Sequence, residues 1–70
     1  MDADQYAYQV FWSPEDRAYV GTSPEFPSLS WISIEQTGAL RGIRALVAEA
    51  VEDLQASGET PPQAIADRHD

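Results

Sequence analysis

The sequence contains no cysteine and no lysine, and its single histidine, His69, is the next-to-last residue. Without cysteine the chain has no disulfide and no cysteine-based metal site, a composition that fits a reducing cytoplasm. A histidine so close to a terminus is poorly held for proton transfer. No Ser-His-Asp set, Cys-His set or glycine-rich phosphate loop can be assembled from the remaining residues. We therefore predict a protein that is not an enzyme and that carries no metal and no cofactor.

Long hydrophobic runs are also missing. No segment approaches the 18 or more apolar residues that a membrane span requires. The first five residues, MDADQ, lack the basic region and the apolar region of a signal peptide. From these observations we expect a soluble, cytoplasmic protein that does not contact a membrane.

Basic residues are scarce: four arginines stand against twelve Asp and Glu, so the net charge is −8. Nucleic-acid affinity comes largely from Lys and Arg that neutralise phosphates, so direct nucleic-acid binding by this chain is not expected. A basic protein partner would be attracted and steered to such a surface. Net charge in small acidic proteins also serves solubility, so charge alone leaves the partner open.

Seventy residues make one domain, residues 1–70. A domain of this size buries only about 60% of the surface that its unfolded chain exposes. Small cores without disulfides or metals are commonly completed by a partner or by self-association. We therefore expect a homo-oligomer, either a dimer or a tetramer.

One long amphipathic helix is predicted over Gln36–Gln55. Its apolar residues recur at helical spacing along one face: Leu40, Ile43, Val47, Ala50, Val51 and Leu54. Ser33 and Gln36 match a capping box at its start. Gly58 suits the position just past its end, where the backbone turns left-handed.

Three segments before the helix alternate with period two and predict strands: Tyr6–Trp12, Arg17–Thr22 and Ser28–Ser33. Residues 13–16 (SPED) form a turn signal between the first two. Gly21 indicates either a bulge or a close approach of another backbone. The predicted fold is α+β: a three-stranded antiparallel meander with the helix packed across one face. The tail Gln63–Asp70 is expected either to add a short fourth strand or to extend unpacked.

Seven aromatic side chains fall in the first half of the chain: Tyr6, Tyr8, Phe11, Trp12, Tyr19, Phe26 and Trp31. Most must serve core and sheet packing, but so many are hard to bury completely in a small sheet. Exposed aromatic residues are typical anchors of protein interfaces. A two-metal nuclease would need carboxylates projecting from a strand, and the predicted strand Tyr6–Trp12 contains none.

Three short stretches, in this order and spacing, resemble the HicB family of antitoxins: WSPED at 12–16, EFPSLS at 25–30 and ALRGI at 39–43. The resemblance extends along nearly the whole chain. It implies a partial RNase H-like fold of the form β-β-β-α(-β). It also implies a partner, the small basic HicA toxin, an mRNA interferase with a double-stranded-RNA-binding-like fold. HicB-type proteins bind this toxin and mask its catalytic histidine.

The chain departs from the family pattern in two places. Members usually continue into a DNA-binding segment, either ribbon-helix-helix or helix-turn-helix, whereas this chain stops at Asp70. Residues 59–70 are therefore expected to be a tail or a linker to a missing segment, and the stretch at 65–68 is similar to the one that precedes the ribbon-helix-helix in relatives. Thr37 and Gly38 stand where the family commonly has two acidic residues.

The first hypothesis is an antitoxin domain that occludes a basic active site. Its candidate toxin-binding residues are Trp12, Glu15, Asp16, Tyr19, Glu25 and Trp31. The alternative is a self-associating structural or regulatory module without a toxin partner. A third reading, a minimal RNase H-like hydrolase, is disfavoured because the first strand lacks a carboxylate.

Overall fold

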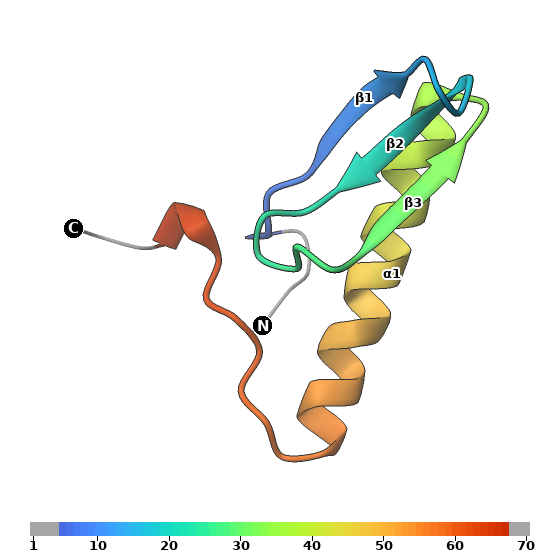
Figure 1. The fold of residues 1–70 in the computed structure, drawn as a ribbon. Helices are drawn as coiled ribbons and strands as arrows, with labels where there is room; N and C mark the ends of the chain where they lie inside the picture. The colour runs from blue at the N-terminus through green and yellow to red at the C-terminus, as the bar shows by residue number, and fades with distance from the viewer. Residues whose placement is uncertain (1–4, 68–70) are drawn as a thin grey trace.

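The computed structural model describes residues 5–67 (Figure 1). Its elements, in chain order, are β1 (Gln9–Ser13), β2 (Ala18–Thr22), β3 (Ser30–Ser33), α1 (Gln36–Ala56) and the short 3-10 helix η2 (Ile65–Asp67). The predicted α+β arrangement of three antiparallel strands followed by one long helix is confirmed.

The sheet is a meander in the order β1-β2-β3, with both pairs antiparallel. Its register is unbroken from the pair Gln9 and Thr22 to the pair Ser13 and Ala18. β1 begins three residues later than the alternation predicts. The reason is that Tyr6 is buried in the core, where its hydroxyl donates a 2.6 Å hydrogen bond to the carbonyl oxygen of Pro62. Tertiary packing here overrides a strong local strand pattern.

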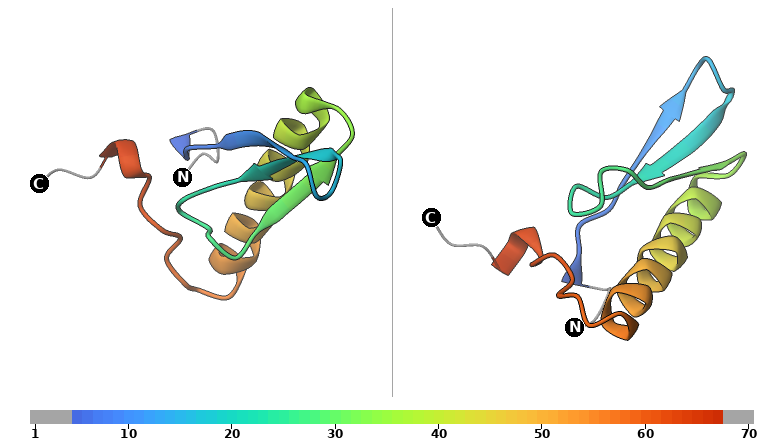
Figure 2. Two further views of the ribbon diagram at one scale, coloured as in Figure 1. Left: turned by 45° about the horizontal axis from the view of Figure 1, so that its top comes forward. Right: turned by 60° about the horizontal axis from the view of Figure 1, so that its bottom comes forward.

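α1 covers one face of the sheet and leaves the other uncovered, as the two further views show (Figure 2). The helix buries the stripe that its periodicity predicts: Ile43 and Val47 are fully buried, and Val51 nearly so. These side chains form one core with Tyr6, Phe26 and Ala64. Leu40, which the pattern places on the same stripe, stays partly exposed near the helix start.

The two ends of α1 differ in how they are capped. At the start, Glu35 is the N-cap residue and makes no side-chain cap hydrogen bond, so the predicted capping box is wrong. Ser33 still belongs to β3, and its hydroxyl instead accepts a 3.2 Å hydrogen bond from the backbone N–H of Glu35. At the end, Gly58 has φ +78° and Glu59 N–H reaches the Leu54 carbonyl at 2.8 Å. This is a Schellman motif, which confirms the position predicted for Gly58.

Gly21 lies where β2 comes close to the backbone of α1. The strand register runs through it without a bulge. A Cβ atom at this position would lie 2.6 Å from the carbonyl oxygen of Ala39 and 2.8 Å from Cγ2 of Ile43. Of the two sequence interpretations, the close backbone approach is therefore confirmed and the bulge is wrong.

The described part of the tail does not form a fourth strand. After the helix the chain turns back towards the N-terminal segment and ends in η2 (Figure 1). Ala64 is fully buried, so this segment packs against the core instead of extending freely. His69 lies outside the described residues.

We predict that Gly21→Ala lowers the free energy of unfolding by about 1–3 kcal/mol, because the added methyl group must displace the helix backbone. Urea unfolding followed by circular dichroism measures the change. Thr22→Ala, at the neighbouring position on the uncovered face, is the matched control and should cost less than about 1 kcal/mol. Equal stability of Gly21→Ala and the parent would contradict the close contact.

Candidate functional site

The hairpin turn (Pro14–Arg17) joins β1 to β2 and carries exposed acidic side chains at one end of the sheet. The Ser13 hydroxyl donates a 2.9 Å hydrogen bond to Oδ2 of Asp16, which closes the turn as the SPED pattern predicts. Arg17 has φ +50°, a left-handed conformation that redirects the chain into β2. Two of the six predicted contact residues, Glu15 and Asp16, are therefore surface groups on a well-defined turn.

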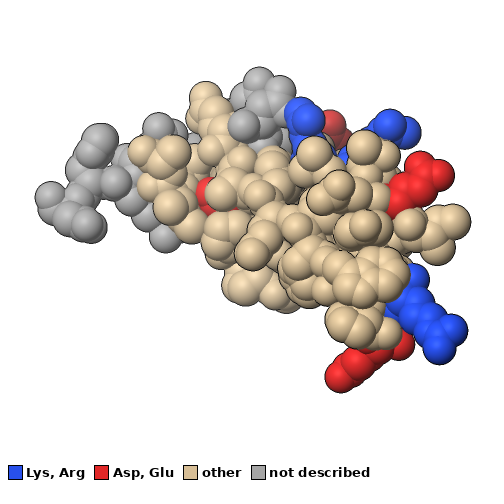
Figure 3. Space-filling view, turned by 90° about the horizontal axis from the view of Figure 1, so that it is seen from above, with Lys and Arg blue, Asp and Glu red and all other residues tan. Residues whose placement is uncertain are grey.

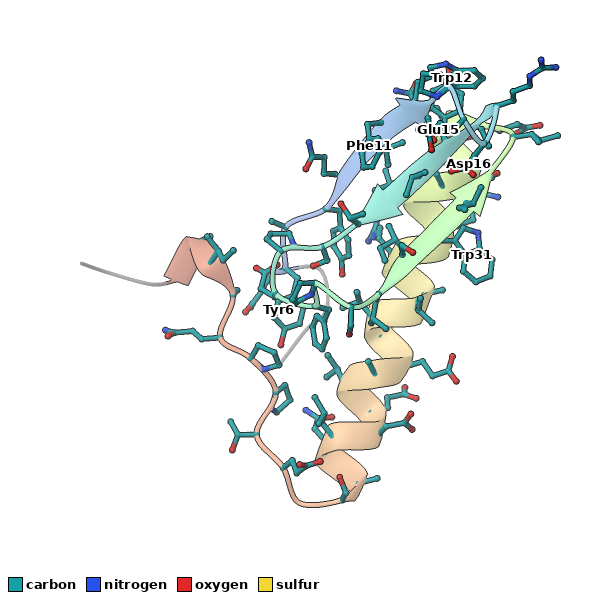
Figure 4. The ribbon with its side chains drawn as sticks, in the orientation of Figure 1. Tyr6, Phe11, Trp12, Glu15, Asp16 and Trp31 are labelled. Atoms are coloured by element: carbon teal, nitrogen blue, oxygen red, sulfur yellow. The ribbon has the colours of Figure 1, made fainter. Side chains whose placement is uncertain are left out.

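Trp12 and Tyr19 form an aromatic pair next to this turn. They lie opposite each other in the register of β1 and β2. Their rings are 5.1 Å apart at 68°, the edge-to-face geometry that aromatic pairs favour. Tyr19 is two residues before Gly21 on β2, so the pair lies on the helix side of the sheet, as Gly21 does. Trp12 is nevertheless 49% exposed. The pair therefore presents apolar surface next to the acidic hairpin turn (Figure 4).

Trp31 is separate from this cluster. It lies on β3, on the helix side of the sheet, opposite Gly21. Its indole ring occupies the space where a side chain at Gly42 would be, so it packs directly on α1. Although 45% of its surface is exposed, it lies on β3, at the opposite edge of the sheet from Trp12 on β1 (Figure 4). The structure therefore divides the predicted tryptophan contacts between two edges.

Glu25 is not a surface residue. Only 6% of it is exposed, and its carboxylate holds three segments of the chain together. It accepts a 2.8 Å hydrogen bond from the backbone N–H of Ile65 in the tail and 3.2 Å contacts from the N–H of Ala7. Its third donor is the Ser23 hydroxyl at 3.1 Å. A carboxylate occupied in this way fixes the fold and does not face a partner.

The surroundings of Glu25 set its protonation. Burial by itself raises the pKa of this carboxyl, but the backbone N–H groups of Ile65 and Ala7 and the Ser23 hydroxyl outweigh burial and lower it. Burial also raises the pKa of Tyr6, and the charge of Glu25 raises it further. Glu25 is therefore held ionised as an acceptor while Tyr6 is held protonated as a donor to Pro62.

The uncovered face of the sheet, here called the open face, contains the residues that the contact prediction omitted. Phe11 lies opposite Val20, and Val20 lies opposite Ile32, so the three form a row across all strands. We refer to these residues as the apolar row. Phe11 is 44% exposed and Ile32 is 55% exposed. Figure 4 looks onto this face, with α1 behind the sheet.

The signal for the apolar row was present in the sequence. Period-two alternation places Phe11 and Trp12 on opposite faces of β1. What it does not reveal is which face the helix covers, because both faces carry large apolar side chains. Ile34, just after β3, is also strongly exposed.

Charge is distributed unevenly around this site. Seen from above, charged side chains gather towards the side where the hairpin turn and the start of α1 lie, and the middle of the view is uncharged (Figure 3). A shallow pocket on α1, lined by Thr37, Leu40, Arg41 and Arg44, brings together no acidic side chain and no histidine. Within residues 5–67 no three histidine, aspartate or glutamate side chains gather closely enough to hold a metal ion. In the same range no helix combines the length and apolarity needed to cross a membrane.

Comparison with models of protein families, with curated proteins and with solved structures finds no match for this chain. The resemblance to HicB antitoxins therefore rests on the residues quoted above.

We predict that Glu25→Gln lowers the free energy of unfolding by about 2 kcal/mol at pH 7, because the amide leaves backbone donors without a charged acceptor. The folded-state pKa of Glu25 is lowered, so its stabilising contribution is complete above the unfolded value of about 4.3 and is lost as the pH falls through the folded value. The difference in the free energy of unfolding between Glu25→Gln and the parent should therefore become smaller at acidic pH.

Chemical unfolding at a series of pH values measures this difference. Glu49→Gln, an exposed substitution of the same kind on α1, is the control and should leave stability nearly unchanged. If the difference in the free energy of unfolding between Glu25→Gln and the parent stays constant down to pH 2, the carboxylate is not the group that holds the tail against the core.

Proposed function

We propose that this chain is the partner-binding domain of a HicB-type antitoxin and that it neutralises a small basic HicA-type mRNA interferase by covering its active site. The observation that carries the proposal is the open face: an uncharged apolar row lies uncovered on a sheet whose hairpin turn bears Glu15 and Asp16. The resemblance of the sequence to HicB antitoxins supplies the identity of the partner.

The apolar row supplies the affinity in this proposal. Phe11 and Ile32 each keep about half of their surface in water, and burying apolar surface contributes roughly 25 cal/mol per Å². Aromatic side chains near the centre of an interface commonly dominate its binding energy. Trp12 and Tyr19 add apolar surface on the helix side of the sheet, next to the hairpin turn.

The acidic residues supply steering and orientation. A chain with net charge −8 attracts a basic protein at long range. Glu15 and Asp16 lie at the rim, where charges accelerate association and reject partners of like charge. Neutralisation of this kind needs steric cover and no chemistry, which agrees with a chain from which no catalytic set can be assembled. We further infer that it takes place in the cytoplasm, where a toxin of this class meets mRNA.

The six predicted contacts take different roles in the proposal. Trp12, Glu15, Asp16 and Tyr19 remain contact residues at one end of the sheet. Phe11 and Ile32 join them as apolar anchors on the open face. Trp31 lies at the far edge as a peripheral contact, and Glu25 acts only by holding the tail in place.

Co-expression tests the function directly. The chain is expressed together with the small basic protein encoded beside it, and growth and co-purification are measured. The proposal requires relief of growth inhibition and a stable complex of the two chains. If growth remains inhibited and the two proteins do not co-purify, the proposal is wrong.

We predict that Ile32→Lys weakens binding of that toxin about 10-fold to 100-fold, or roughly 1.4–2.8 kcal/mol, because it places a positive charge in the apolar row that meets a basic partner. Isothermal titration calorimetry measures the dissociation constant. Ala45→Lys introduces the same charge at an exposed position of α1, away from the open face, and should leave binding within about 3-fold. Equal effects of both substitutions would show that only net charge matters.

A further inference from the structure

The outer edge of β1 has none of the features that normally prevent a sheet edge from pairing. Natural edge strands are protected by charged side chains, proline, bulges or a covering segment. β1 (QVFWS) contains no charged residue and no proline, and its register with β2 is regular. Within residues 5–67, no segment runs along this edge in either Figure 1 or Figure 2.

Both faces of the sheet also leave apolar surface open next to this edge. On the open face the apolar row ends at Phe11, which is 44% exposed. On the helix side, α1 packs mainly against β2 and β3, so β1 overhangs it. Trp12 on β1 and Leu40 on α1 are both left partly exposed. The backbone edge of β1, the open face beside it and the part of β1 that extends beyond α1 are therefore all uncovered.

We propose that β1 pairs with β1 of a second copy of this chain, antiparallel and centred on Phe11. Phe11 is the middle residue of the five-residue strand, so a two-fold axis there sets Phe11 opposite the second copy's Phe11. The same register sets Val10 opposite the second copy's Trp12. The product is one continuous sheet of six strands, three from each copy, in which the two apolar rows join into one.

The uncharged, apolar β1 strand complements itself in this register, which favours a second copy as the occupant, and charge decides where two copies can meet. Two chains of net charge −8 repel each other over most of their surface. In the proposed register, Glu15 and Asp16 lie beside positions 7 and 6 of the second copy, which are Ala and Tyr. Acidic turns therefore do not meet across the axis, and the strands that pair are uncharged.

The size of the contact sets its strength. A five-residue edge with one aromatic residue on each face buries less than the roughly 800 Å² per partner of a standard interface. The dimer should therefore dissociate on dilution. The inference does not depend on the toxin, because edge pairing leaves the open face free.

A single introduced cysteine gives the first test, since the chain has no cysteine of its own. Directly opposed residues of antiparallel strands have Cα atoms about 4.5–5.5 Å apart, within the range of a disulfide. Phe11→Cys should cross-link into a dimer under mild oxidation at least about 10-fold faster than Ile32→Cys, the matched control at the opposite edge of the same row. Equal cross-linking of both, or faster cross-linking of Ile32→Cys, would overturn the proposal.

The second test introduces charges of opposite sign at position 11 in two variants. Light scattering measures the molecular mass, and circular dichroism checks that each variant is folded. The parent should have twice the mass of one chain at millimolar concentration and dissociate on dilution. Phe11→Lys and Phe11→Glu should each be monomeric, because like charges would face each other across the axis, and their equimolar mixture should form a heterodimer. A parent that is monomeric at every concentration, or two variants that do not associate when mixed, would refute pairing through β1.

Discussion

The contact between α1 and a single face of a three-stranded sheet determines most of what this molecule presents to its surroundings. The absence of a side chain at Gly21 lets the backbone of Ala39 and the side chain of Ile43 come close to β2. One helix can cover only one face, so the other face keeps the apolar row in water. Because the helix lies mainly under β2 and β3, the β1 edge is left open as well. Both proposed interfaces follow from this one packing arrangement.

A second constraint is the buried carboxylate of Glu25. The core between α1 and the sheet is small, and it includes Tyr6, Phe26 and Ala64, which come from three separate segments. Glu25 ties these segments together through backbone N–H groups, and Tyr6 and Phe26 meet edge to face at 5.3 Å. The ionised group is therefore used to stabilise the fold of a chain that has neither disulfides nor a large core.

The two proposed contacts complement each other. Edge pairing would extend the sheet sideways without covering the open face, and it would join two apolar rows into a longer surface. A basic partner could then meet a surface that is apolar at its centre and acidic at its outer turns, where Glu15 and Asp16 lie.

The sequence by itself determined the elements of this fold. The helical spacing predicts 36–55 where the helix spans 36–56, Gly58 ends it as predicted, and the three strands appear in the predicted order. These features depend on local periodicity and backbone conformation, which neighbouring residues control. Only the tertiary structure decided that Glu25 is buried, that Trp31 packs on Gly42, and that Phe11 rather than Trp31 lies on the open face. These outcomes depend on which face of the sheet the helix covers, and that choice is made by contacts between residues far apart in the chain.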